Sequence, residues 1–196
     1  MKNKGILIVI SGPSGVGKGT VISKFINDKK LNLKYSVSMT TRKPRANEVD
    51  GEHYHFVSKE EFKQAIENGE LLEWAEFVDN YYGTPIKQVE EQLNNGYNVI
   101  LELEVVGCTQ VREKRPNSLT IFITPPSMEE LRNRIEKRSS EPLDVIQQRL
   151  SKAEKEMELL KNYKYVVCND DPVLASDIIS LIIERTRELE RERNAK

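Results

Sequence analysis

The chain has 196 residues, of which 31% are charged and 38% are hydrophobic, and 30 basic against 31 acidic side chains leave a net charge of −1. A domain of this length buries roughly 70% of the surface of its unfolded chain, so it needs no disulfide or metal to hold a core. The balanced charge argues against a general nucleic-acid-binding protein, which would carry a basic excess.

The first residues of the chain predict a strand, a glycine-rich loop and a helix. Residues 6–10 are continuously apolar and rich in β-branched side chains, as in a strand buried on both faces of a parallel sheet. Glycines follow over residues 12–19, and apolar side chains at helical spacing occupy residues 20–27. The apolar run is far shorter than the roughly 20 residues that cross a bilayer, so we expect no membrane association.

Short elements and polar loops fill the next part of the chain. Ser58 and Glu61 form a capping-box pattern that begins a helix. The other expected elements are a strand over residues 34–39, a loop over 40–51, a strand over 53–57, the capped helix over 59–67 and an extended segment over 71–78.

Longer elements alternate again after residue 83. Thr84 is expected to cap a helix that has Pro85 at its first position and ends near residue 94. The elements expected after it are strands at 98–105 and 119–123, a helix capped by Ser127 that reaches residue 137, a helix at 144–161, a strand at 165–168 and a helix that begins at Asp171 and Pro172. We interpret the charged end, residues 184–193, as a solvated helix face, with a partner contact as the alternative.

The alternation predicts an α/β protein, a parallel sheet with helices on both faces. Residues 38–83 interrupt that pattern as a small inserted subdomain, and a second break follows Arg138. Two cysteines, Cys108 and Cys168, are too few for a disulfide framework or a multi-thiolate metal site, and we expect both to fill the core of a reduced, cytoplasmic protein.

Residues 12–18 match the first seven positions of the phosphate-binding loop. Backbone N–H groups of such a loop surround a phosphate chain at a helix N-terminus, and Lys18 is placed to reach the β and γ phosphates. The hydroxyl residue that usually follows the lysine is replaced by Gly19, with Thr20 next. We therefore expect Mg²⁺ to be held largely by the phosphates and water; the alternative for the segment is a plain turn.

The inserted segment adds two arginines, Arg42 and Arg45, beside a proline. Arginine forks match phosphate oxygens bidentately, although spacing alone leaves a solvated basic loop as the alternative. His53 and His55 alternate on one expected strand, but no third ligand lies near them, so we expect structural roles rather than a metal site.

Several motifs in this order resemble the guanylate kinase family over nearly the whole chain. They are the loop Gly12 to Lys18, then Ser38, Thr40, Thr41, Arg42, Pro44 and Arg45, then Asp50, Gly51, Tyr54, Phe56 and Val57, then Leu72, Glu73, Trp74 and Ala75, then Asn80, Tyr81, Tyr82, Gly83 and Thr84, then Pro125, Pro126 and Ser127, and finally Val167, Cys168, Asn169 and Asp170.

The resemblance implies an enzyme that transfers the γ-phosphoryl group of ATP to GMP, with Mg²⁺ bound to ATP and no nucleic-acid partner. It implies a P-loop NTPase-type core over residues 1–37 and 84–196, a GMP-binding subdomain over 38–83 and a lid over 138–150. The ATP-binding residues it implies are Gly12, Pro13, Ser14, Gly15, Val16, Gly17, Lys18, Gly19, Thr20 and Asn169, the last on the adenine side. Catalysis is implied for Lys18, Arg42, Arg134, Arg138 and Arg149.

The GMP site implied by the resemblance has a phosphate end and a base end. At the phosphate end lie Arg42, Arg45, Tyr54 and Tyr82. At the base end Ser38 and Thr84 meet guanine O6, and Glu73 accepts from N1–H and the 2-amino group, helped by Glu104. Glu102 and Glu104 stand where many relatives have aspartates, and Val106 where they have glutamine, so the roles of these two acids stay open.

Two alternatives remain at this point. One is a P-loop kinase for another nucleoside monophosphate, against which Glu73, Ser38 and Thr84 favour guanine. The other is a non-catalytic guanylate-kinase-like domain that binds proteins; such domains typically lack the loop lysine or lid arginines, whereas Lys18, Arg138 and Arg149 are present here. The oligomeric state is not predicted.

Overall fold

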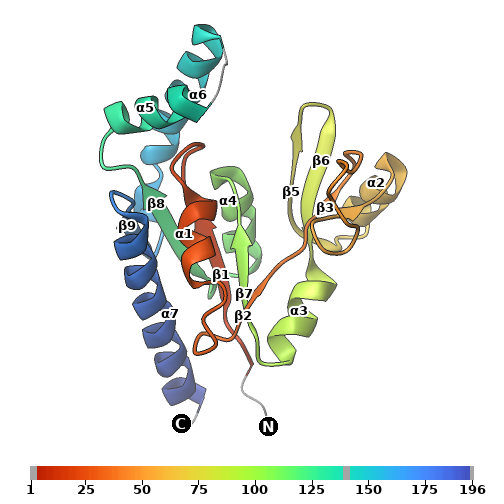
Figure 1. Ribbon diagram of the computed structural model, residues 1–196. Helices are drawn as coiled ribbons and strands as arrows, with labels where there is room; N and C mark the ends of the chain where they lie inside the picture. Colours follow the sequence, from red (N-terminus) through yellow and green to blue (C-terminus); the bar gives the residue numbers. More distant parts are fainter. Residues whose placement is uncertain (1–3, 139–141, 195–196) are drawn as a thin grey trace.

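Two β-sheets organise the chain (Figure 1). The structure, a computed structural model, describes residues 4–138 and 142–194. All neighbouring strands of the larger sheet are parallel, which confirms the expected sheet type. Across that sheet the strands lie in the order β2 (Leu33–Tyr35), β7 (Asn98–Glu102), β1 (Leu7–Ser11), β8 (Leu119–Thr124) and β9 (Tyr165–Cys168).

Helices cover both faces of this sheet, as predicted. Side chains that alternate along β1 point to opposite cores, so Ile8 and Ile10 join one cluster and Leu7 and Val9 join the other. The first face carries α1 (Lys18–Phe25) and α7 (Pro172–Asn194); the second carries α3 (Ile86–Asn94) and α4 (Val105–Lys114). No helix in the described ranges has the length and apolarity that a bilayer crossing requires.

Two further helices extend beyond the carboxyl-terminal edge of the sheet, at the top of Figure 1. These are α5 (Met128–Arg138) and α6 (Leu143–Met157), which pack against each other. The Ser127 hydroxyl accepts from the Glu130 N–H at 3.0 Å, so the predicted cap of α5 is present. A short 3₁₀ turn, η1 (Leu160–Asn162), leads from α6 back to β9.

The second sheet has its own small core. Its strand order is β4 (His55–Phe56), β3 (Met39–Thr40), β6 (Asn80–Pro85) and β5 (Leu71–Phe77). Helix α2 (Lys59–Glu67) covers it through Phe62 and Ala65. The predicted capping box is complete, because Glu61 N–H donates to the Ser58 hydroxyl at 3.1 Å and Ser58 N–H donates to the Glu61 carboxylate at 2.8 Å.

Several local predictions were wrong. The strand expected over 34–39 is divided between β2 and β3, which belong to different sheets, because the chain leaves the larger sheet after Tyr35. The strand expected over 98–105 ends at Glu102, and α4 begins at Val105 where no helix was expected; β-branched residues and a glycine in its first turn hid it. The helix expected over 144–161 ends at Met157.

The last error concerns a cap and is accompanied by a misplaced cysteine. Pro85, not Thr84, lies at the N-cap of α3, without a side-chain hydrogen bond, because the Thr84 hydroxyl is used elsewhere. Cys108 is buried as expected. Cys168 is exposed, because it ends the edge strand β9 and no further layer covers its side chain.

Candidate active site

Two adjoining pockets lie where β1 and β7 end at the carboxyl-terminal edge of the large sheet. The first, of about 830 Å³, is lined by most of the predicted phosphate-binding loop, Lys18 included. The second, of about 580 Å³, is lined by Glu73 and Tyr82. Ser38, Tyr54 and residues 102–104 line both. A donor loop and an acceptor region far apart in sequence therefore meet at one edge.

Glycine conformations shape the phosphate-binding loop. Gly15 (φ 86°) and Gly17 (φ 92°) both adopt the left-handed region that side chains disfavour. Lys18 bends over the loop, and its Nζ donates to the carbonyls of Gly12 at 2.7 Å and Pro13 at 3.2 Å. Burial lowers the pKa of Lys18, and the negative charges of Glu102 and Glu104 oppose that shift. The ammonium group is thus held at the rim of the loop.

Asn169 supports the loop from behind. Its side chain is only 2% exposed, and its Nδ2 donates to the Val16 carbonyl at 2.8 Å. A Cβ built at Gly17 would lie 2.8 Å from the same Nδ2, so only glycine allows this approach. The amide is buried and its Nδ2 is bonded to the loop, so the structure shows a supporting contact of Asn169, and its place on the adenine side stays a prediction.

Two of the three predicted catalytic arginines on α5 and α6 reach the loop. Arg134 donates through Nε to Glu130 at 2.8 Å and through Nη1 to the Asn169 carbonyl at 3.0 Å. Arg149, on α6, donates through Nη2 to the Ser14 hydroxyl at 2.9 Å. Arg138 ends α5, and its side chain lies outside the described part of the chain. Guanidinium groups from α5 and α6 therefore lie on the loop that would hold the donor phosphates.

An acid that the sequence reasoning missed holds the acceptor arginine. Arg42 forms a bidentate pair with Glu48, at 2.9 and 2.8 Å, and its guanidinium lies 5.5 Å from the centre of the Tyr54 ring. Glu48 also accepts from the backbone N–H of Arg45, whose side chain is exposed. The hydrogen bonds from Arg42 lower the pKa of Glu48 to about 2. Tyr82 packs edge-on against Tyr54, so the two tyrosines that are predicted to bind the GMP phosphate lie together.

Glu73 is a buried carboxylate that faces the second pocket. It is 5% exposed, and burial raises its pKa while the hydrogen bond from Thr84 lowers it. The Thr84 hydroxyl donates to Glu73 Oε1 at 2.6 Å. This differs from the expected role of Thr84, because a hydroxyl has one proton and here gives it to the carboxylate rather than to a base. Ser38 lines the same pocket.

The two acids that follow β7 have separate partners. Glu102 accepts from the Tyr35 hydroxyl, and its carboxylate oxygens would lie 3.7 and 3.8 Å from a Cβ built at Gly19. Glu104 accepts from Lys152 of α6 at 2.7 Å and lines the same pocket as Glu73; its help to Glu73 in base recognition stays a prediction. Glu102 thus lies beside the loop. An oxygen ligand there suits Mg²⁺, although the described residues contain no group of three or more acidic, histidine or cysteine side chains placed to hold a metal.

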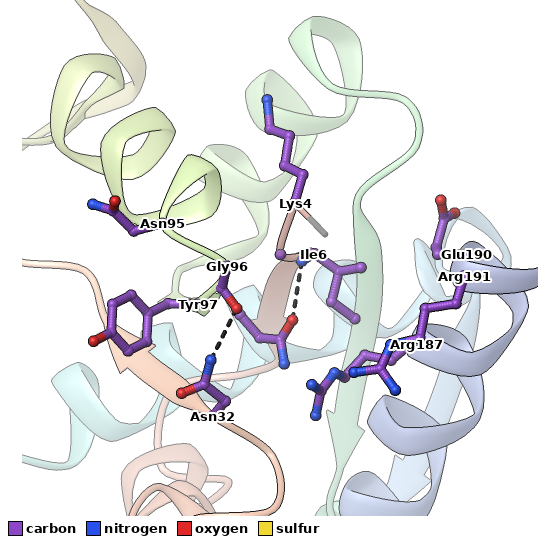
Figure 2. A pocket seen from close by; sticks show the side chains of 11 residues that line it. Lys4, Ile6, Asn32, Asn95, Gly96, Tyr97, Arg187, Glu190 and Arg191 are labelled. Carbon is purple, nitrogen blue, oxygen red and sulfur yellow. Dashed lines mark hydrogen bonds between the residues drawn. The ribbon is translucent and has the colours of Figure 1, made fainter. Parts of the chain in front are cut away.

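A different hollow lies at the opposite, amino-terminal edge of the large sheet (Figure 2). It has a volume of about 390 Å³, and Figure 2 shows Asn32 and Tyr97 on one side of it and Arg187 and Arg191 of α7 on the other. None of the predicted site residues lines it, so the predicted chemistry is confined to the other edge.

The sequence did not predict three partners of site residues, which are Glu48, Tyr35 and Lys152. Arg42 and Glu48 are six residues apart in a loop, and no periodicity relates such positions. Lys152 and Glu104 are separated by 48 residues and meet only because α6 folds back over the sheet edge. The spacing of Val105, Cys108 and Val111, all buried, was the available signal for α4.

Comparisons with known proteins show the family of the chain. The family model described as guanylate kinase matches residues 4–185. Guanylate kinase of Latilactobacillus sakei is 54% identical over 184 residues, covering 94% of this chain and 91% of that one, and the enzyme of Lactiplantibacillus plantarum is 50% identical over 187 residues, covering 95% and 91%. A crystal structure of guanylate kinase from Anaplasma phagocytophilum superimposes with a TM-score of 0.72 at 36% identity, covering 94% of this chain and 87% of that one. The chain belongs to the guanylate kinase family.

Proposed function

We propose that this protein transfers the γ-phosphoryl group of ATP to GMP, giving ADP and GDP. The observation that carries the proposal is the junction of the two pockets, with the Lys18 loop lining one and the buried Glu73 carboxylate lining the other. In this reading residues 1–37 and 84–196 bind ATP, residues 38–83 bind GMP, and residues 138–150 form the lid. We also place the protein in the cytoplasm, where the exposed thiol of Cys168 stays reduced.

Phosphoryl transfer needs positioning and charge neutralisation rather than a protein nucleophile. Lys18, Arg134 and Arg149 supply positive charge around the donor loop, at the place where negative charge develops. Arg42, with Arg45 in the same loop, binds the acceptor phosphate. To bind the acceptor phosphate, the Arg42 guanidinium has to donate to the phosphate oxygens in place of Glu48 or in addition to it.

Mg²⁺ bound with ATP would neutralise phosphate charge, and Glu102 is the carboxylate placed to hold it, directly or through water. Glu102 is oriented by the Tyr35 hydroxyl, which donates to it.

Base recognition falls to Glu73. An ionised carboxylate only accepts hydrogen bonds, so it suits N1–H and the 2-amino group of guanine and opposes the N1 acceptor of adenine. Thr84 fixes one carboxylate oxygen, Oε1, and so orients the group.

A coupled assay of ADP release with ATP and a panel of nucleoside monophosphates tests the proposal. GMP should have a kcat/KM about 10⁴-fold or more above that of AMP, because a site that pairs buried polar groups rejects analogues that leave them unpaired. Comparable rates with AMP, CMP or dTMP would assign the chain to another monophosphate. No turnover with any of them would favour a protein-binding role.

A further inference from the structure

We infer that one face of helix α4, formed by Gly107 and Gln110, positions the Glu73 carboxylate and thereby sets base selectivity. The two residues are three apart on the helix and so lie on one face. Neither residue is among those that the sequence singled out, since that helix was not expected. The inference rests on the proposed function, in which Glu73 recognises guanine.

The first observation is the place of Glu73 in its strand. The pairing of β5 with β6 is irregular between Leu71 and Trp74: Leu71 pairs with Pro85, and Trp74 pairs with Gly83. Leu72 and Glu73 of β5 therefore oppose the single residue Thr84 of β6, which is a β-bulge, and Glu73 lies within it. Regular strand pairing does not fix the direction of the Glu73 side chain there, so contacts made by the side chain itself have to do so.

The second observation is the contact that replaces a neighbouring strand. β5 is an edge strand of the second sheet. The Gln110 amide binds both backbone groups of Trp74, accepting from its N–H at 3.1 Å and donating to its carbonyl at 2.8 Å. This pairing resembles that of an adjacent strand, and it fixes the peptide that directly follows Glu73. Lys114, one turn further on, donates to the Leu71 carbonyl at 2.8 Å on the other side of the bulge.

The third observation is the space that Gly107 leaves. A Cβ built on Gly107 would lie 2.7 Å from Glu73 Oε2, and its next nearest neighbours are also Glu73 atoms, at 3.4 and 3.6 Å. Thr84 holds the other oxygen at 2.6 Å. The carboxylate is thus confined between a hydroxyl and the bare backbone of α4. Any side chain at position 107 would push the Glu73 carboxylate out of the position from which it is proposed to bind the base.

The same helix also belongs to the core. Val105, Cys108 and Val111 are buried in the cluster beneath the large sheet, so α4 is fixed relative to β1 and β7. Gly107 and Gln110 therefore hold the base-reading carboxylate in a fixed position relative to β1, the strand that leads into the donor loop. We assign them as positioning residues; neither is proposed to touch the nucleotide.

Gly107→Ala is the sharpest test, because its expected effect on function opposes its expected effect on stability. Alanine favours a helix over glycine, and the crowded atoms lie at the flexible end of one side chain, so the melting temperature should not fall. Base selectivity should fall. It is measured as the calorimetric Kd of IMP divided by that of GMP, since IMP has the same phosphate and N1–H but lacks the 2-amino group.

We expect Gly107→Ala to lower this Kd ratio about tenfold, as for a charged hydrogen bond that is lost. Gln110→Met, which keeps the length but leaves both Trp74 groups without their partner, should lower it in the same direction. Gln110→Glu keeps the acceptor for the Trp74 N–H and should lower it less. The KM for ATP should stay unchanged in all three variants.

Thr109→Val is the matched control. It lies next to Gln110 and also loses one hydrogen bond, that of its hydroxyl to the Val105 carbonyl, but this bond stays within α4. Its Kd ratio should equal that of the wild type. In a Glu73→Gln background, Gly107→Ala should have no further effect on the ratio, because the group it displaces has lost its charge.

The outcomes separate the inference from the function beneath it. If Glu73→Gln lowers the ratio but Gly107→Ala and Gln110→Met leave it unchanged, the positioning role is overturned and base reading by Glu73 stands. If Glu73→Gln also leaves the ratio unchanged, both are overturned. If Thr109→Val lowers the Kd ratio by the same amount, the effect comes from general destabilisation of α4, and the positioning role is overturned.

Discussion

Replacing Glu73 by glutamine should weaken catalysis and at the same time spare or improve folding. The carboxylate is 5% exposed, and its Oε1 already accepts a hydrogen bond from Thr84 at 2.6 Å. In Glu73→Gln one acceptor oxygen becomes an amide donor that faces the donors of guanine. The loss of one charged hydrogen bond costs about 1.5–3 kcal/mol, so kcat/KM for GMP should fall roughly 10- to 150-fold.

The effect on stability has the opposite sign. Burial raises the pKa of Glu73 above its ordinary value of 4.5, so the folded state binds more protons than the unfolded state above that pH. Ionised Glu73 therefore costs stability that is absent at low pH and grows as pH rises from 4.5 through the raised pKa. Without nucleotide at pH 7, the variant should unfold at the same or a higher temperature, and the difference should shrink at acid pH.

Steady-state kinetics with GMP and AMP, together with thermal unfolding of the nucleotide-free protein, measure both effects. An unchanged ratio of kcat/KM for GMP over AMP would refute base reading by Glu73. A fall in melting temperature at pH 7 that persists below pH 4.5 would instead mean that the hydrogen bond from Thr84 outweighs the cost of burying the charge.

Four other variants test the remaining parts. Lys18→Ala should lower kcat by on the order of 10² or more while calorimetric GMP affinity stays near normal; half the wild-type rate at saturating ATP would contradict its role. Arg42→Ala should weaken GMP binding by about one to two decades with little change in the KM for ATP, and an unchanged Kd would make its loop a solvated segment. Asn169→Ala should raise the KM for ATP and destabilise the fold by about 1 kcal/mol, because the Val16 carbonyl loses its partner; unaltered ATP kinetics would remove its supporting role. Ser58→Ala should lower the free energy of unfolding in urea by about 1 kcal/mol without affecting kcat, since it removes only the cap of α2.

Local signals were sufficient where the determining contacts lie within a few residues. The bounds of α2 follow from its capping box, and strand β1 follows from an apolar run that both core clusters bury. The phosphate-binding loop was equally clear, because its glycine conformations and its lysine act within seven consecutive residues. The parallel pairing and the helical cover of the large sheet followed the expected α/β pattern, since parallel strands require crossovers that pack on its faces.

The sequence by itself therefore determined the fold class, the phosphate-binding loop and, through the order of its motifs, the family. Only the tertiary structure decided that Asn169 supports the loop, that Glu48 holds Arg42, and that α4 confines Glu73. These contacts join chain segments whose separation bears no relation to helix or strand periodicity; Gln110 and Trp74 are 36 residues apart. Their geometry depends on where the sheets place each element, because a buried carboxylate or amide takes the partner that packing brings to it.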